Sequence, residues 1–564
     1  MNFGITTKIS VLFLLNIFLI GFTLKSSEYF SYLSFAGRDF FGMLSNKIQE
    51  KIFLTEFDES VNVEQMKFDI LQNNLRIKIV PNEKYLIGSV NTKLLILENT
   101  DRIVLNLDDN LEITKVNGTR GYKNFSHLGN VVEIYFEESL EPQDSIDITI
   151  EYHGHPREIG LAGFDFVEGT NRFYTLSEPN FAKTWWPCKD IPSDKFLASM
   201  EIIVPEKIVA VSNGSLVNIE HIDTNWISYS YEVSYPIASY LISICGAEYK
   251  EFGNTFNSVS GKEIPLKYFV FEDKMMDAKK DFEVIPDMMR VFEKLYGEYP
   301  FQNEHYGIVE FDWQFGGMEH QTMTSIGSNY ITGLQLHNRL LAHELAHEWF
   351  GNSVTLNDWD DIWLNEGFAT YSAYLFSELA GKKNKLDPNR LFYGSLYKPN
   401  GFLFGSTVYE KGAWVLHMLR KKVGDDKFFQ AVRQYYNTHK FSNATTANLK
   451  SVFESTCGSD LSKFFNQWIY SQVEKPVFKI SYTTFEGENN YICKVILEQK
   501  QPREIYENLF PIRLELKNRN IIEADILNNS KMQILTFNVP APVENLIIDP
   551  EGDLLKKAIY KKIN

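Results

Sequence analysis

The sequence His343-Glu344-Leu345-Ala346-His347, followed after eighteen further residues by Glu366, constrains this chain more than any other feature. Two histidines four positions apart project from one face of a helix, where both imidazoles can reach one Zn²⁺ at about 2 Å. Glu344 is too close in sequence to complete the tetrahedron comfortably, so it is better placed to polarise a water. Glu366 would supply the third protein ligand from a second helix. Three protein ligands and one open position are typical of a catalytic zinc site, whereas a structural site has four.

The alternative is a buried helix whose histidines are satisfied by ordinary hydrogen bonds. The flanking sequence argues against it, because residues 340–350 are apolar on one side and are followed by Gly351-Asn352, a typical helix stop. Residues 363–371 again place a carboxylate, Glu366, inside an apolar stretch. An unpaired buried carboxylate is costly, so a metal partner is the more economical interpretation.

Length, charge and cysteine content limit the class of protein. A chain of 564 residues is too long for one core, and we expect about three domains. The formal net charge of −17 argues against a nucleic-acid partner. The four cysteines are scattered without CxxC spacing, so they indicate neither a zinc ribbon nor an obvious disulfide framework.

The amino-terminal segment indicates export. Residues 9–24 are almost wholly apolar, a length that suits the core of a signal peptide and is marginal for a membrane span. We expect residues 1–27 to be an uncleaved membrane anchor or a cleaved signal peptide, with membrane association through residues 9–24 and an extracytoplasmic location. A buried core helix is the alternative. We expect residues 28–61 to be a packed linker or a short helical segment on the membrane surface.

The hydrophobic period changes twice along the remainder of the chain. Residues 62–255 alternate as strands do, for example at 75–80 and 131–136, with expected turns at Asn117-Gly118 and Asn213-Gly214. Residues 256–475 have a helical period, and residues 476–564 return to a strand pattern that fits a small β-sandwich. The clearest expected helices are residues 275–296, 339–350, 413–423 and 428–438.

Three further segments offer catalytic or binding groups. Gly316 and Gly317 allow close backbone approach to an extended ligand, and Glu319 could anchor a positive group. The hydroxyl of Tyr409 could donate a hydrogen bond to an oxyanion. Glu178, beside a proline, could add a second carboxylate for an amine. Taken locally, each segment also has an ordinary explanation: a Gly-Gly turn, a packed tyrosine and a solvated turn carboxylate.

Taken together, these motifs resemble the zinc aminopeptidases of the aminopeptidase N family, a group of gluzincin metallopeptidases. The resemblance rests on the zinc motif with its spacing to Glu366, on Gly316-Gly317-Met318-Glu319, on residues 409–413 (Tyr-Glu-Lys-Gly-Ala), on residues 185–190 (Trp-Trp-Pro-Cys-Lys-Asp) and on residues 548–551 (Ile-Asp-Pro-Glu). It covers roughly residues 62–555 in the family's order. It implies a multidomain α+β protein with an antiparallel β saddle domain (62–255), a thermolysin-like α+β catalytic domain (256–475) and a β-sandwich (476–564).

The resemblance also implies residue roles. His343, His347 and Glu366 resemble the ligands of one Zn²⁺, Glu344 the general base, Tyr409 the oxyanion-stabilising tyrosine, Glu319 and Glu178 the carboxylates that bind the substrate's α-ammonium, and Gly316, Gly317 and Met318 the segment beside the substrate backbone. Two positions depart from the family pattern: His320 stands where Asn is usual, and Leu176 where many relatives have Gln. The stretch from Glu366 to Tyr409 is also shorter than is usual.

The expected function is therefore zinc-dependent hydrolysis of the first peptide bond of peptides that carry a free terminal amine. An endopeptidase with the same zinc chemistry is one alternative, against which Glu319 and Glu178 argue. A lipid-epoxide hydrolase, an activity of one branch of the family, is a second. A catalytically silent scaffold is a third, and the intact ligands and base argue against it.

Overall fold

The computed structural model describes residues 63–382, 385–390, 392, 394–399, 403–472, 475–501 and 505–563. The chain divides into two compact units, residues 1–54 and 55–564, and the described residues belong to the second. The predicted signal or anchor segment, the apolar residues 9–24 and the segment 28–61 all lie outside them. Among the described helices, none combines the length and the apolar character needed to span a bilayer.

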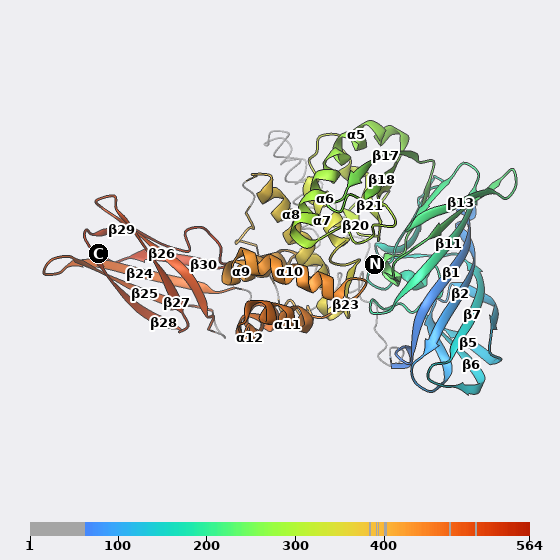
Figure 1. Cartoon of the computed structure of the whole chain (residues 1–564), viewed down its shortest axis with the longest axis horizontal. Helices are drawn as coiled ribbons and strands as arrows, with labels where there is room; N and C mark the ends of the chain where they lie inside the picture. Colours follow the sequence, from blue (N-terminus) through green and yellow to red (C-terminus); the bar gives the residue numbers. More distant parts are fainter. Residues whose placement is uncertain are drawn as a thin grey trace, which may run out of the picture. The chain divides into compact units, whose positions relative to one another are not determined.

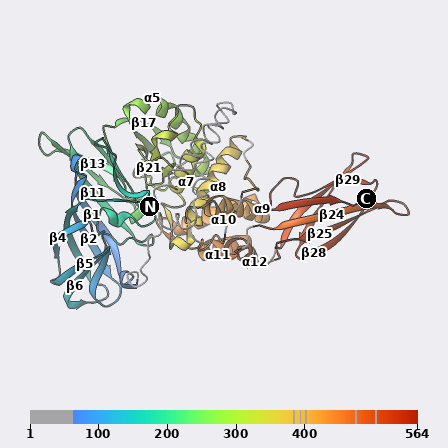
Figure 2. The same cartoon turned by 180° about the vertical axis from the view of Figure 1, so that it is seen from behind.

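The amino-terminal part of this unit is built from strands (Figures 1 and 2). Its large sheet contains, in spatial order, β13 (Ser215–His221), β14 (Trp226–Glu232), β11 (Lys195–Pro205), β1 (Phe68–Val80), β2 (Tyr85–Ile96), β7 (Ser145–Gly154) and β4 (Leu111–Gly118), with β15 (Ile237–Ala238) beside β11. Side chains along β1 and β2 alternate between buried and more exposed, as expected for strands with one face on a core. The pairing is antiparallel except between β1 and β11, which run parallel.

Two smaller sheets complete this part. One contains β3 (Thr100–Asn106), β6 (Val131–Leu140) and β5 (Tyr122–Leu128), and the other β12 (Val209–Ser212), β16 (Ile244–Ala247), β10 (Phe173–Leu176), β9 (Ala162–Phe166) and β8 (Glu158–Ile159). Asn213 and Gly214, in the turn after β12, bond to the backbone of Gln321 and the hydroxyl of Thr322. The second small sheet is thereby joined to the segment that follows Glu319.

The middle part combines a five-stranded sheet with helices. The sheet order is β17 (Lys250–Asn257), β18 (Glu263–Val270), β19 (Tyr306–Phe311), β21 (Met323–Gly327) and β20 (Gly317–Met318), and β22 (Val354–Leu356) pairs separately with β23 (Ser442–Ala444). The α-helices are α5 (Met275–Asp281), α6 (Ile285–Tyr296), α7 (Asn338–His347), α8 (Trp363–Leu379), α9 (Gly412–Val423), α10 (Asp425–His439), α11 (Thr446–Cys457) and α12 (Ser462–Phe465). Single 3₁₀ turns lie at η1 (Pro81–Glu83), η2 (Ala182–Thr184), η3 (Ser239–Leu241), η4 (Glu272–Lys274), η5 (Phe282–Val284), η6 (Ser328–Tyr330) and η7 (Trp359–Asp361), and π-helical turns at η8 (Thr407–Lys411) and η9 (Asn466–Tyr470).

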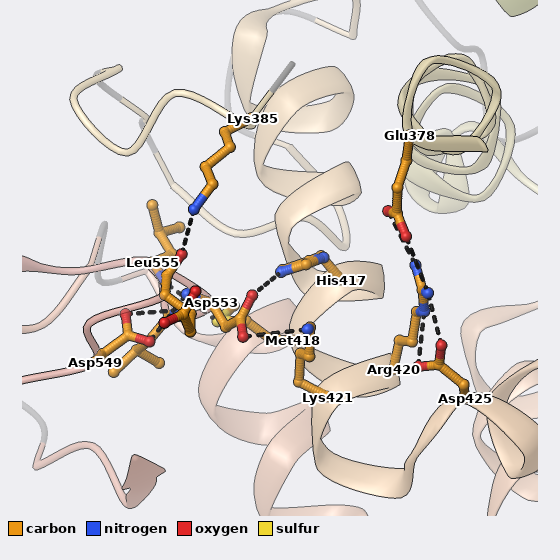
Figure 3. A network of polar contacts seen from close by, with 12 residues as sticks. Glu378, Lys385, His417, Met418, Arg420, Lys421, Asp425, Asp549, Asp553 and Leu555 are labelled. Carbon is orange, nitrogen blue, oxygen red and sulfur yellow. Dashed lines mark hydrogen bonds and ion pairs between the residues drawn. The ribbon is translucent and has the colours of Figure 1, made fainter. Parts of the chain in front are cut away.

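The carboxy-terminal strands form two sheets. One contains β28 (Met532–Val539), β25 (Tyr491–Gln499), β24 (Val477–Glu486) and β30 (Lys557–Lys562), and the other β27 (Ile521–Asn528), β26 (Asn508–Leu516) and β29 (Val543–Ile548). The loop after β29 reaches α9, where Asp553 contacts His417 Nε2 at 3.0 Å and Lys421 Nζ at 3.1 Å (Figure 3). The backbone N–H of Leu555 also donates to the sulfur of Met418 at 3.5 Å. The loop therefore joins the sandwich to the helical part.

The structure corrects the boundaries of several predicted helices and turns. Residues 275–296 are not one helix: η5 separates α5 from α6, because the proline at the start of α6 has no N–H to continue a preceding helix. The zinc-motif helix ends at His347 rather than at residue 350. Asn117 and Gly118 lie within β4, in register with β7, so the turn follows them.

Other predictions are confirmed. The helices expected at 413–423 and 428–438 are present as α9 and α10, with α10 beginning earlier than expected. Gly214 lies in a turn with a φ of 77°. All four cysteines are buried and free, in agreement with the lack of a disulfide framework.

Candidate active site

Two packed helices hold the predicted zinc ligands. α7 carries His343 and His347, and α8, which packs against it, carries Glu366. The Nε2 atom of His343 lies 3.1 Å from Glu366 Oε2 and 3.1 Å from His347 Nε2, and His347 Nε2 lies 3.6 Å from Glu366 Oε2. The two nitrogens and the carboxylate oxygen therefore converge on one point, as the sequence spacing predicts.

The donor set fits a zinc ion. Bonds of about 2.0–2.1 Å arranged tetrahedrally place ligand atoms roughly 3.3 Å apart, close to the three separations above. Imidazole nitrogen and carboxylate oxygen are the ligand types that zinc accepts, and three protein ligands leave one position open. The second nitrogens of the two histidines are also oriented: His347 Nδ1 donates to the carbonyl oxygen of Phe350 at 3.0 Å, and His343 Nδ1 lies 3.4 Å from Thr370 Oγ1. Such outer contacts fix the ring orientation of metal-binding histidines.

Three more carboxylates lie beside this triad. Single ligand atoms of Glu319, Glu344 and His347 lie within 4.8 Å of one another, and so do those of Glu178, Glu319 and Glu366. The side chains of Glu178 and Glu319 are buried, and among the described residues neither Oε1 atom has a hydrogen-bond partner. Burial, and then the nearby carboxylates of Glu319 and Glu366, raise the pKa of Glu178. Burial also raises the pKa of Glu319, and the nearby His347 partly offsets this shift. A cationic group placed between the two carboxylates would satisfy both oxygens.

The Gly-Gly segment lies against the zinc-motif helix. A Cβ atom on Gly317 would lie 2.8 Å from the side chain of Glu344, and Gly316 has a φ of 134°, so both positions need glycine. The close approach that the structure shows is to Glu344, and the approach to an extended ligand stays a prediction. β20, which contains Gly317 and Met318, is the last strand of its sheet among the described residues. An extended peptide can add to an edge strand of this kind.

Tyr409 reaches the site despite the short connection from Glu366. It lies in the π-helical turn η8, and its ring stacks on that of His343 with centroids 5.7 Å apart and planes inclined by 19°. A Cβ on Gly412 would lie 2.8 Å from the Cα of Gly367, so the α8 and α9 backbones touch beside Glu366 and fix this position. Burial and nearby carboxylates, Glu366 first among them, raise the pKa of Tyr409, so its phenol keeps a proton to donate.

The two departures from the family pattern are both buried. The Nδ1 atom of His320 lies 2.8 Å from Ser325 Oγ, and burial lowers the pKa of His320 to about 3, so this histidine is neutral. Leu176 ends β10, two residues before Glu178, and is 6% exposed.

Sequence reasoning missed the residues that hold Glu319. Asn352 was recognised only as part of a helix stop, yet its side-chain amide donates to the carbonyl oxygen of Glu319 at 2.7 Å. Lys195 of β11 donates to the carbonyl oxygens of Asn352 and Ser353 at 2.7 and 3.1 Å. No local signal could have identified Lys195, because it lies more than 150 positions from its partners in the sequence.

Comparisons with known proteins agree with this geometry. Residues 69–241 match the family model of the peptidase M1 N-terminal domain, and residues 281–394 and 395–468 match that of the peptidase family M1 domain. Glutamyl aminopeptidase of Sus scrofa is 24% identical over 460 residues, which are 75% of this chain and 48% of that protein. Probable aminopeptidase 1 of Sulfurisphaera tokodaii is 26% identical over 351 residues, which are 57% of this chain and 43% of that protein. The chain spans about half the length of these curated relatives.

Solved structures share the fold. An M1 zinc metallopeptidase of Deinococcus radiodurans, solved as a variant with a Tyr-Ser-Ala substrate, has a TM-score of 0.66 at 23% identity. The match covers 73% of this chain and 96% of that chain. Aminopeptidase A of Legionella pneumophila, solved with aspartic acid, has a TM-score of 0.76 at 16% identity, and the match covers 88% of this chain and 60% of that chain. With both family models matched in order and the zinc-type triad at the junction of α7 and α8, this chain belongs to peptidase family M1.

Proposed function

We propose that this chain is a zinc aminopeptidase that binds one Zn²⁺ and hydrolyses the first peptide bond of peptides with a free terminal amine. The observation that carries the proposal is the pair of buried carboxylates, Glu178 and Glu319, whose ligand atoms lie within 4.8 Å of that of Glu366. An α-ammonium held by both would leave only the first carbonyl of a peptide within reach of the triad.

Each residue then has a defined task. Zinc, when bound, supplies a Lewis acid that polarises a carbonyl oxygen and makes water more acidic. Glu344 accepts a proton from the attacking water and returns it to the leaving amine. The phenolic hydroxyl of Tyr409 donates a hydrogen bond to the carbonyl oxygen as it becomes negative. β20 pairs with the backbone of the substrate and sets its register, and Met318 lies beside that backbone.

The alternatives are less well supported. An endopeptidase would have to bury Glu178 and Glu319 against a chain without a cation, which is costly for two carboxylates. A silent scaffold would not need Glu344, His343, His347 and Glu366 all in place. A lipid epoxide has no ammonium for the two carboxylates to bind, so its hydrolysis would leave both unused.

We also propose an extracytoplasmic location, supported by the apolar residues 9–24. Expression of the full chain in its host, followed by cell fractionation and amino-terminal sequencing, tests this. Recovery at the membrane with an intact amino terminus supports an anchor, and a shortened chain outside the cytoplasm supports a cleaved signal. An intact chain in the cytoplasm would refute export.

The decisive experiment compares one peptide with a free and with an acetylated amino terminus, before and after chelation, with the metal content measured by mass spectrometry. Cleavage of only the free form, after its first residue and abolished by chelation, supports an aminopeptidase with one zinc per chain. Internal cleavage of both forms would mean that Glu178 and Glu319 do not anchor an amine. No cleavage of either form, with zinc bound stoichiometrically, would favour a lipid substrate or a scaffold.

A further inference from the structure

Arg339 contacts two of the segments that surround the zinc-type triad. It lies on α7, one helical turn before His343, and its Nη2 atom lies 3.1 Å from Glu410 Oε1. Its guanidinium carbon also lies 4.3 Å from the centre of the ring of Tyr374 on α8. Arginine is suited to this double role, because its planar group can stack on an aromatic ring while its edge bonds to a carboxylate.

These contacts join the three segments that carry the proposed catalytic groups. α7 carries His343, α8 carries Glu366 two turns before Tyr374, and η8 carries Tyr409 directly before Glu410. The π-helical turn η8 is an irregular element of a kind that is frequent at functional sites, and two contacts hold it in place. The Gly367–Gly412 contact fixes one side of η8, and the Arg339–Glu410 pair fixes the side that faces α7.

The burial of Glu410 makes this ion pair important for the turn. The side chain of Glu410 is only 6% exposed and that of Arg339 is 36% exposed, so the carboxylate is largely removed from water. Loss of the guanidinium would leave Glu410 buried without this charged partner, which is strongly unfavourable. The turn could relieve that cost by rotating Glu410 toward solvent, and Tyr409 would move with it.

We propose that Arg339 is a positioning residue, which through Glu410 holds Tyr409 stacked on His343 with its hydroxyl at the site. This inference rests on the proposed function, in which Tyr409 stabilises the oxyanion. Arg339 does not touch the substrate in this proposal, so its loss changes turnover and leaves substrate binding unchanged.

Steady-state kinetics on a free-amine peptide test the proposal with Arg339→Gln, Glu410→Gln and Tyr409→Phe, each loaded with zinc. Tyr409→Phe should lower kcat by about 10²- to 10³-fold, the usual cost of one oxyanion donor. Arg339→Gln and Glu410→Gln should each lower kcat by about tenfold to hundredfold through misplacement, with KM changed less than about twofold. Arg339→Lys, which keeps the charge but not the planar stacking, should recover part of the loss.

The double variant Arg339→Gln/Tyr409→Phe separates positioning from a general structural role. If Arg339 acts through Tyr409, the double variant is less than about twofold slower than Tyr409→Phe alone. Full multiplication of the two losses would overturn the proposal, as would an unchanged kcat in Arg339→Gln or a loss explained by lower zinc content. Arg290→Gln on α6 is the control, because Arg290 forms an exposed pair with Asp287, and it should keep wild-type kinetics.

A second measurement does not depend on activity. Fluorine NMR of the zinc-free protein with Tyr409→3-fluorotyrosine reports where this ring lies. In the protein with Arg339 we expect one resonance, shifted from that of a solvent-exposed fluorotyrosine. A move of this resonance toward the chemical shift of the exposed residue in the Arg339→Gln variant supports the proposal, and an unchanged resonance overturns it. If the wild-type chain cleaves no free-amine peptide, the proposed function fails while this measurement still decides whether Arg339 positions Tyr409.

Discussion

Replacement of Glu319 by glutamine tests the proposed recognition of the substrate amine. The substitution keeps the shape of the side chain and removes one of the two negative charges that would face the α-ammonium. Two unit charges about 4 Å apart interact by about 4 kcal/mol at the effective dielectric constant of a protein site. Because Glu178 remains and some solvation cost is relieved, we expect a loss of about 3 kcal/mol, or roughly a hundredfold in kcat/KM.

The assay is kcat/KM for a dipeptide amide with a free amine and for its N-acetylated form. Glu319→Gln should lose about a hundredfold on the free-amine substrate and less than about threefold on the acetylated one, so the preference for a free amine collapses. Glu310→Gln is a matched control, because Glu310 is another fully buried carboxylate. It lies on β19, in the sheet whose last strand, β20, directly precedes Glu319, and it accepts a hydrogen bond from the N–H of Phe271. Equal losses on both substrates would refute the reasoning, since Glu319 would then act on the triad rather than on the amine.

Three further predictions follow from the same structure. Glu344→Gln should retain zinc, measured by mass spectrometry, while kcat falls about 10²- to 10⁴-fold; retained turnover would exclude Glu344 as the base. Gly317→Ala should weaken kcat/KM at least tenfold, because the added Cβ would lie 2.8 Å from Glu344, whereas Gly121→Ala, where nothing lies within 4 Å, should be neutral. Hydrogen bonding to His417 lowers the pKa of Asp553 to about 2, below its unfolded value, so its contribution to stability is present above about pH 4 and lost as the pH falls through 2. Since the side chain of Asp553 is 32% exposed, Asp553→Asn should cost only about 1 kcal/mol at pH 6. Calorimetry should find most of this difference lost at pH 2, and a constant difference at both pH values would contradict the reasoning.

The convergence of His343, His347 and Glu366 was predictable because their geometry is local. The spacing of His343 and His347 fixes their relative positions on any helix, and an apolar stretch around Glu366 signals a second buried helix. The break between α5 and α6 was not predicted, because the apolar period continues through residues 275–296 while the proline interrupts the backbone hydrogen bonds. Periodicity reports which face is buried and says little about where a helix is interrupted.

The surroundings of the site depend on contacts that sequence spacing does not record. Glu178 comes from the strand-rich amino-terminal part and meets Glu319 only after the two parts pack together. The support of Glu319 by Asn352, and of Asn352 by Lys195, likewise joins residues far apart in the chain. The family resemblance identified Glu178 and Tyr409 as site residues, whereas local patterns left each with an ordinary explanation.

The contact between Gly367 and Gly412 makes the geometry of the site independent of the length of the segment that connects α8 and α9. Because the α8 and α9 backbones touch directly, the separation of Glu366 and Tyr409 does not depend on how many residues connect the two helices. The entropic cost of closing a loop rises slowly with its length, by about 0.6 kcal/mol for each doubling. A change in the length of the connection between α8 and α9 would therefore leave Glu366 and Tyr409 at the same distance.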